Sequence, residues 1–553
     1  MTRAKIVSNV LLGLSLLAIV GLAFIMLRDE DGDSADADAD AEQADAAAPD
    51  ETPDLIFITI DTLRSDGIGA YGNPAAKTPN IDGLAREGVL FQNSVTAFPR
   101  TTPGMGSLFT GLWPHHHGSR EVWEKVEKGT FLTELLHDRG YQTIGMTSNG
   151  ACGHKQGFAR GFDHFVRRKQ FEDNRAGYVT DKALELLAEA KPDAPLFLWV
   201  HYTDPHWPYL PPRSYKDQPK APGCRALMHK RHEREKVSLG QIQANHEGMS
   251  AAVLDECRAM YDATITYTDA EIGRLIEGLQ ASDRWSEAVV VLTADHGENM
   301  GEDGYYYAHG PSLAAGSLQV PLIFKGPGIP TGEVDDGLAR GVDVMPTILQ
   351  LLGQPPDSWP QMDGQSLTWR WDPAVDPPAH PIDYAYAESA TEFHTEIDKF
   401  VGSGRPGKRY CVHDQRYSMC VDAETEAANF YDRPADPLLK QALDVELVDA
   451  DARARLEAAL ETWPQGTARQ RMIRTKQWKL VERPLFAGGY EQALYDVSSG
   501  APEARDLRAD NSTRALKLEK LLHRWLEDLP AYEAEKRSSE ALRELRALGY
   551  IGD

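Results

Sequence analysis

The clearest fold signal in this chain is the run Val289-Val290-Val291-Leu292-Thr293-Ala294-Asp295-His296-Gly297-Glu298-Asn299. Its apolar, largely β-branched half predicts a buried strand, and the strand stops at an acid, an imidazole and a glycine. In an open α/β sheet, ligands bind in the crevice outside the carboxyl ends of the strands. We therefore expect Asp295 and His296 to lie over such a crevice, where both side-chain types serve as metal ligands.

The folded chain opens at Asp54 with a second apolar run, Leu55–Ile60, which ends in the same way at Asp61. Parallel strands of one sheet end at the same edge, so Asp61 is expected to project into the same crevice. After a turn, a short helix is predicted over Asp82–Gly88, with Asn80 or Asp82 as its N-cap.

Length and charge narrow the class of protein. A chain of 553 residues is too long for one simple core and predicts roughly two to four structural units. The net charge is -26, but the segment Asp29–Asp54 alone holds 12 acids and no base. The rest of the chain is only moderately acidic and has no cluster of basic residues, which excludes nucleic acid as a partner.

The N-terminus predicts a membrane anchor over residues 1–28. Arg3 and Lys5 precede Ile6–Leu27, an apolar segment long enough to span a bilayer. The basic flank indicates that the body lies on the extracytoplasmic side, in the periplasm or at the cell surface. A cleaved signal peptide is the alternative. Residues 29–53 are acidic and poor in large apolar side chains, which predicts a disordered linker.

The five cysteines show no metal-type spacing, and an odd number cannot all pair. Cys411 and Cys420 are close enough in sequence to close a small loop, which an exported location would permit. For Cys152, Cys224 and Cys257, buried free thiols are about as good an interpretation as disulfide bonds.

The segment Phe98–Gly111 predicts a helix start. Pro103 suits the first helical position and Thr102 the N-cap, which places Thr101 at the helix N-terminus, where unpaired amides favour negative charge. A hydroxyl there could serve as a nucleophile if a metal lowered its pKa. Taken alone, this local sequence favours two threonines that merely cap a helix.

Two further buried strands are predicted over Tyr141–Ser148 and Pro195–Thr203. Asn149 follows the first strand, and Asp204 and His206 follow the second, so all three are expected near the crevice.

Seven short motifs occur in order along the chain. They are Ile-Asp-Thr-Leu-Arg at 60–64, Thr-Pro-Asn-Ile-Asp at 78–82, Leu-Phe-Thr-Gly-Leu-Trp-Pro-His-His-His-Gly at 108–118, Gly-Phe-Asp at 161–163, Asp-Pro-His-Trp-Pro-Tyr at 204–209, Ala-Asp-His-Gly-Glu at 294–298 and Val-Pro-Leu-Ile-Phe-Lys-Gly-Pro-Gly at 320–328. Each motif alone is modest, but together they resemble the sulfatase family of the alkaline-phosphatase superfamily.

The resemblance implies a doubly wound α/β fold, with a mostly parallel sheet flanked by helices, and a divalent metal site. Asp61 matches the first acidic metal ligand, and Asp295 with His296 matches the later pair. Typical sulfatases carry a second acid where this chain has Thr62, and often an asparagine where it has His296. Imidazole in place of an amide favours zinc or manganese, with calcium as the weaker alternative.

The resemblance also places the nucleophile at Thr101, which would double as a metal ligand. Sulfatases carry Cys-x-Pro-Ser-Arg here, with the first residue oxidised to formylglycine, and that pattern falls on Thr101-Thr102-Pro103-Gly104-Met105. Threonine does not match the residue that is oxidised. It is similar instead to the nucleophile of phosphodiesterase, phosphatase and phosphoglycerol- or phosphoethanolamine-transferase relatives. A covalent Thr101 ester would then pass to water or to an acceptor alcohol.

His206 and His309 are the remaining catalytic candidates. In the resemblance, His206 matches the histidine that contacts the ester, and His309 lies where relatives place a lysine or a second histidine. We favour substrate contact for both; a general acid, or a second metal held with Asp204, are the alternatives. Glu298 and the histidines at 115–117 are not assigned.

Beyond residue 375 the pattern resembles the small C-terminal subdomain of sulfatases. Adjacent antiparallel strands are predicted over Arg471–Val481 and Ala493–Val497, and an amphipathic helix over Ser512–Leu529. The expected units are a catalytic domain at 54–375, a C-terminal α+β subdomain at 376–530 and a helical tail at 531–553.

Together these features predict a metal-dependent hydrolase that cleaves phosphate or sulfate esters of a lipid, glycan or small molecule. The chemistry of the candidate site favours phosphate esters over sulfate esters as substrates, whereas the family resemblance alone would predict a sulfatase. Two other functions stay open: a phosphoglycerol- or phosphoethanolamine-type transferase, and a catalytically inactive sulfatase fold that binds anionic ligands.

Overall fold

The computed structural model describes residues 52–168, 176–212, 215, 218–226, 250–302, 306–310, 312–379 and 384–391, and 409–527 with gaps. The predicted anchor, nearly all of the acidic linker, and the C-terminal tail lie outside the described residues. Among the helices of the described part, none is both long and apolar enough to cross a bilayer. The chain divides after Glu51 into two compact units, and every described residue belongs to the second, which starts at Thr52.

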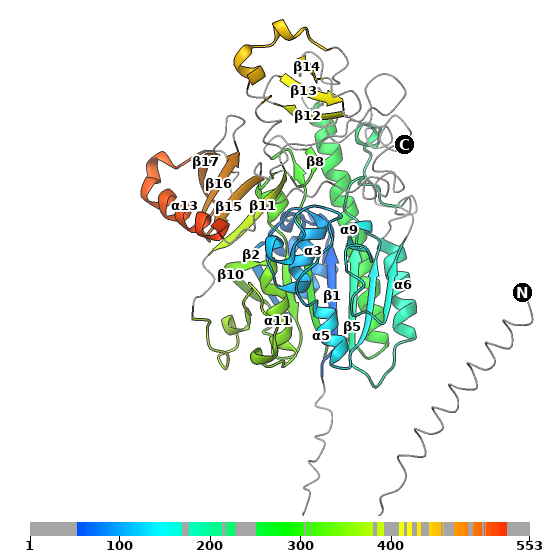
Figure 1. The fold of residues 1–553 in the computed structure, drawn as a ribbon. Coiled ribbons are helices and arrows are strands. Elements are labelled where there is room, and N and C mark those ends of the chain that lie inside the picture. The colour runs from blue at the N-terminus through cyan, green and yellow to red at the C-terminus, as the bar shows by residue number, and fades with distance from the viewer. Residues whose placement is uncertain are drawn as a thin grey trace, which may run out of the picture. The chain divides into compact units, whose positions relative to one another are not determined.

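An eight-stranded sheet forms the centre of this unit, in the order β10-β2-β9-β6-β1-β5-β3-β4. Figure 1 labels β10, β2, β1 and β5 of this sheet and several of the helices that flank it. Its strands are β1 (Leu55–Ile60), β2 (Val89–Val95), β3 (Gln142–Thr147), β4 (His164–Arg167), β5 (Leu196–Tyr202), β6 (Val289–Ala294), β9 (Leu322–Lys325) and β10 (Glu333–Arg340). All neighbours run parallel except β9, which is antiparallel to β2 and β6. The prediction of a mostly parallel sheet is confirmed.

Helices cover both faces of the sheet, which is why all six residues of β1 are buried. Alternate side chains of a strand point to opposite faces. Leu55 and Phe57 join the core under α3 (Thr101–Thr110), α5 (Leu132–Asp138) and α11 (Val344–Leu351). Ile56 and Ile58 join the core under α2 (Pro79–Arg86), α6 (Ala176–Ala188) and α9 (Ala251–Ala281). The expected doubly wound α/β fold is therefore correct.

A four-stranded antiparallel sheet lies beyond the main sheet, with the order β11-β15-β16-β17. Its elements are β11 (Ala385–Thr391), β15 (Arg469–Arg474), β16 (Trp478–Pro484), β17 (Tyr490–Asp496) and the covering helix α13 (Ser512–Glu527). The single strand predicted over Arg471–Val481 is wrong, because Thr475 Oγ1 accepts hydrogen bonds from the amides of Gln477 and Trp478 and turns the chain into a hairpin. A third sheet consists of β12 (Arg409–His413), β13 (Tyr417–Asp422) and β14 (Ala428–Asp432).

The cysteines pair differently from the simplest expectation. Cys224 and Cys257 form a disulfide that fastens the segment before α9 to that helix, while Cys152 is a buried thiol. Cys411 and Cys420 face one another in the register of β12 and β13, and their side chains lie outside the described set.

Helix α2 begins earlier than predicted, at Pro79 with Thr78 as N-cap. Proline suits the first helical turn because its missing N–H would be unpaired there anyway. The two predicted caps serve tertiary contacts instead: Asp82 accepts from the Ala70 amide, and Asn80 donates to Asp269 on α9.

Candidate active site

Asp61 and Asp295 leave the central sheet side by side. β1 and β6 pair in parallel with Ile60 opposite Ala294, so the next residue of each strand lies at the carboxyl edge. Both carboxylates are fully buried. Thr62 then adopts a left-handed conformation, with φ 58°, which is unusual for a β-branched residue. Its amide donates to Asp295 Oδ1 at 3.3 Å, which ties the two strand ends together.

Asn149, which follows β3, orients Asp61. Its side-chain Nδ2 donates to Asp61 Oδ2 at 2.5 Å, and its Oδ1 accepts from the Ala151 amide at 2.7 Å. In the described part of the chain, Asp61 Oδ1 has no hydrogen-bond partner. One oxygen of Asp61 is therefore held in place, and the other is available to a ligand.

His201 is a site residue that the sequence did not reveal. It lies inside β5 opposite Thr59, and its Nδ1 hydrogen-bonds Thr59 Oγ1 at 2.8 Å. Its Nε2 has no hydrogen-bond partner among the described residues. One ligand atom each from Asp61, His201 and Asp295 lies within 4.8 Å of the others. A histidine inside an apolar strand gives no motif signal; only the pairing of β5 with β1 brings it to the site.

His296 and Thr101 complete the cluster. His296 Nδ1 donates to the Gly297 carbonyl at 2.9 Å, which turns Nε2 toward the acids. That Nε2 lies 3.4 Å from Asp295 Oδ2, 3.6 Å from Asp61 Oδ1 and 3.3 Å from Thr101 Oγ1. The four residues predicted as metal ligands therefore converge from β1, β6 and the start of α3.

The electrostatics of the cluster suit a cation. Burial, followed by the nearby charges of Asp295 and Glu298, raises the pKa of Asp61 well above its ordinary value. Burial likewise raises the pKa of Asp295 to about 6 and lowers the pKa of His296 to about 3. Two buried carboxylates beside neutral imidazoles are costly as anions unless a positive charge lies between them.

The donor set fits a divalent metal ion. Asp61 Oδ1, Asp295 Oδ2 and His201 Nε2 are buried atoms without hydrogen-bond partners in the described chain. Carboxylate oxygens with imidazole nitrogens are ligands that zinc and manganese accept, whereas calcium prefers six to eight oxygens.

The two other predicted histidines lie beside this cluster. The ring centroid of His309 is 4.3 Å from that of His296 and 5.1 Å from that of His206. His309 Nδ1 donates to Glu298 Oε1 at 3.0 Å, and the Tyr209 hydroxyl donates to Glu298 Oε2 at 3.1 Å. Glu298 is fully buried, and its carboxylate holds the His309 ring.

The alternative of a second metal held by Asp204 gains no support from geometry. Among the described residues, one other group could hold a metal, and it consists of Glu482, Glu519 and His523 on the C-terminal sheet and α13. Asp204 belongs to neither group.

Helix α3 starts two residues before the predicted first position. Thr101 is its first residue and Arg100 its N-cap. Thr102 is not the cap, because its hydroxyl donates to the Ala151 carbonyl and accepts from the Trp123 amide, both at 3.0 Å. Pro103 is tolerated at the third position because the first-turn amides have no helical partners. The placement of Thr101 at a helix N-terminus is confirmed.

The histidines at 115–117 do not form one metal site. They belong to α4 (Pro114–His117) and point to different partners. His116 Nδ1 donates to Asp363 at 2.8 Å, and His117 Nε2 donates to the Pro103 carbonyl at 3.2 Å. His115 packs against Trp525 of α13.

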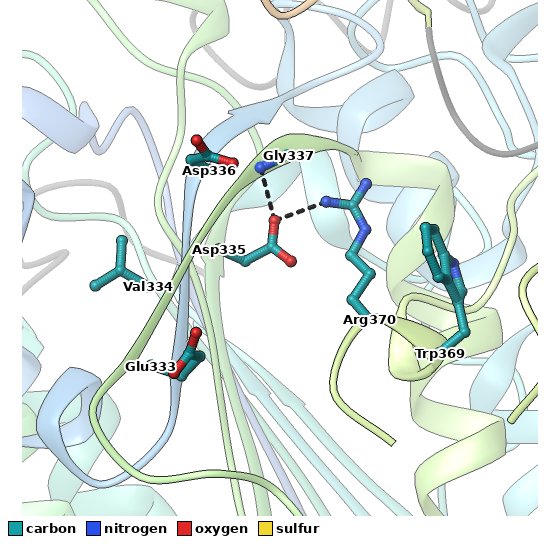
Figure 2. A pocket seen from close by; sticks show the side chains of 7 residues that line it. All are labelled: Glu333, Val334, Asp335, Asp336, Gly337, Trp369 and Arg370. Atoms are coloured by element: carbon teal, nitrogen blue, oxygen red, sulfur yellow. Dashed lines mark hydrogen bonds and ion pairs between the residues drawn. The ribbon is translucent and has the colours of Figure 1, made fainter. Parts of the chain in front are cut away.

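A shallow surface hollow along β10 is separate from this crevice. Figure 2 shows Asp335 pointing toward Arg370 and the Gly337 amide. The Arg370 guanidinium and that amide each lie 2.7 Å from Asp335 Oδ1. The hollow contains none of the candidate residues, because β10 is the edge strand and β1 the inner one.

Comparisons with known proteins identify the family and the fold. The family model described as Sulfatase matches residues 53–354. The multifunctional alkaline phosphatase superfamily protein PehA of Trinickia caryophylli is 27% identical over 450 residues, which cover 66% of this chain and 84% of the relative. An arylsulfatase of Clostridium perfringens is 26% identical over 392 residues, which cover 58% and 80%.

Solved structures show the same fold. The phosphonate monoester hydrolase of Agrobacterium radiobacter superposes with a TM-score of 0.59 at 20% identity, over 86% of this chain and 96% of that one. With a family model that covers more than half of its length, this chain belongs to the sulfatase family.

Proposed function

We propose that this protein hydrolyses phosphate esters ahead of sulfate esters, with Thr101 as the nucleophile and one bound zinc or manganese ion. Membership of the sulfatase family carries the coarser statement, that the chain is a hydrolase of sulfuric or phosphoric esters. The observation that carries the finer proposal is the 3.3 Å approach of Thr101 Oγ1 to His296 Nε2, beside the unpartnered carboxylate oxygens.

Asp61, His201, Asp295 and His296 would hold the metal. When bound, a divalent ion supplies the positive charge that favours an ionised hydroxyl and offsets charge on the ester oxygens. The start of α3 adds unpaired backbone amides and the positive end of the helix dipole at Thr101.

The reaction has two displacements at phosphorus or sulfur. Thr101 first loses its hydroxyl proton to solvent. Thr101 Oγ1 then forms a bond to that atom while the bond to the leaving oxygen breaks, and the leaving oxygen takes a proton from His309 or His206. Water then attacks the same atom and gives a proton back to that histidine, while the bond to Thr101 breaks and the threonine oxygen takes a proton from solvent. Glu298 supports His309 by accepting the hydrogen bond of its Nδ1.

The preference for phosphorus rests on Thr101 and His296, which replace the oxidisable cysteine and the asparagine of typical sulfatases. The names of the relatives, an alkaline phosphatase superfamily protein and phosphonate monoester hydrolases among them, are consistent with it. We also propose export and membrane tethering through residues 1–28, on the sequence pattern alone.

The test is turnover of aryl phosphate monoesters, diesters and sulfates by metal-stripped protein reloaded with zinc or manganese. Thr101→Val keeps the side-chain shape and is expected to reduce kcat by at least about 1000-fold. Thr110→Val, at the other end of the same helix, is the matched control and should retain activity. Full turnover by Thr101→Val would remove the nucleophile assignment.

A further inference from the structure

We infer that Arg100 binds the non-bridging oxygens of the anionic ester. This inference rests on the proposed function and names the cation that recognises its substrate. The sulfatase pattern would place an arginine at position 105, but Met105 is fully buried in the core under α3 and carries no charge. An anionic substrate therefore needs a cationic side chain from another position.

Arg100 lies next to the nucleophile at the mouth of the helix. Its backbone is extended, with φ -147° and ψ 145°, and its carbonyl accepts from the Gly104 amide at 2.9 Å. Arg100 is the residue before Thr101 and is only half-buried, so its side chain starts where the ester must approach.

Gly310 leaves room for the guanidinium. A Cβ at Gly310 would lie 2.6 Å from Arg100 Cζ and 2.8 Å from Nη2, so the planar group rests against the glycine backbone. Gly310 follows His309, whose ring contacts His296. The guanidinium thus lies beside the residue that follows the candidate general acid, and Arg100 itself directly precedes the nucleophile.

Arg100 brings a positive charge to the start of α3, next to Thr101. A guanidinium offers a planar fork of donors that matches two oxygens of a phosphoryl or sulfuryl group. The loss of this fork should harm dianionic monoesters most, because they carry the larger charge.

The experiment compares Arg100→Gln and Arg100→Lys with Arg86→Gln, a control on the exposed face of α2. The probe for binding is inorganic phosphate, measured by calorimetry on metal-loaded protein, alongside KM and kcat for an aryl phosphate monoester. Metal content and thermal melting of each variant are recorded in parallel.

Arg100→Gln is expected to weaken phosphate binding and raise KM by about 10- to 100-fold, with unchanged metal content and melting temperature. The phosphate affinity and KM of Arg100→Lys should fall between those of the wild type and Arg100→Gln, because lysine keeps the charge and loses the planar fork of donors. Unchanged phosphate affinity and KM in Arg100→Gln would overturn the inference while the proposed function stands. If phosphate binding depends on Arg100 but the protein turns over none of the esters, the proposed function is wrong.

Discussion

His201 decides how many side chains of this chain can hold the metal. Its Nε2 faces the acids, whereas Nδ1 is fixed by Thr59. We expect His201→Asn to weaken metal binding by at least about tenfold, because a ligand nitrogen is lost. Titration of metal-free protein with zinc in competition with a chelating dye measures this, and the exposed His137→Asn is the control. Equal affinities would reduce His201 to a structural partner of Thr59.

Glu298 tests the assignment of His309 as general acid. Glu298→Gln keeps the size of the side chain and removes the charge that supports a protonated His309 ring. The expected loss in kcat is about 100-fold for alkyl esters, whose leaving oxygens need a proton, and much smaller for nitrophenyl esters. The kcat values for a series of esters with different leaving groups measure how the loss depends on the leaving group. An equal loss across the series would contradict the assignment.

At the scale of elements, Gly104 sets how closely α3 approaches the end of β6. A Cβ at Gly104 would lie 2.7 Å from the Asp295 carbonyl oxygen, so Gly104→Ala must push the helix start and Thr101 away from the cluster. We expect a loss of stability of roughly 1–3 kcal/mol together with lower kcat. Gly83→Ala in α2 is the matched control. A Cβ there meets nothing closer than 3.7 Å, so stability should rise by up to about 1 kcal/mol.

The packing of α4 against α3 predicts a pH dependence of stability. His117 is fully buried, its Nδ1 accepts from the Ser119 amide, and burial lowers its pKa to about 3. The unfolded chain takes up this proton near pH 6.5 and the folded chain only near pH 3. The neutral ring therefore stabilises the fold fully above pH 6.5, and this contribution is lost as the pH falls toward 3.

We expect His117→Asn to flatten the fall of unfolding free energy between pH 6.5 and pH 4, by roughly 1–3 kcal/mol over the range. Denaturant titrations of both proteins at several pH values measure the two slopes. Identical slopes would mean that the ring titrates normally in the folded protein.

The sequence predicts strand ends better than it predicts contacts made in three dimensions. Asp61, Asp295 and His296 could be placed because apolar runs stop at them. The prediction that Thr102 is the N-cap is wrong because its hydroxyl makes hydrogen bonds with the backbone of Ala151 and Trp123. No local sequence pattern reveals these contacts. His201 was missed for the same reason, since its role depends on the register of β5 beside β1.

At the scale of the whole molecule, a buried ion pair joins the loop after α4 to the four-stranded sheet. Arg120, after α4, makes hydrogen bonds of 2.7 to 3.0 Å to both carboxylate oxygens of Glu388 on β11. The side chains are 9% and 2% exposed. An exposed pair, Lys476 with Asp336, joins the turn between β15 and β16 to β10 of the main sheet, with side chains 57% and 76% exposed.

Burial decides which of these two ion pairs contributes to the free energy of unfolding. Arg120→Met should lower the unfolding free energy by roughly 2–4 kcal/mol, because Glu388 keeps a buried charge that has lost the hydrogen bonds of Arg120, and Arg471 Nε lies farther away, at 3.6 Å. Adding Glu388→Gln removes that charge and should restore part of the loss. Lys476→Met should change stability by less than about 0.5 kcal/mol, since water screens the exposed pair. Denaturant unfolding of the three variants measures these differences, and equal effects of Arg120→Met and Lys476→Met would show that the buried pair stabilises the fold no more than the exposed one.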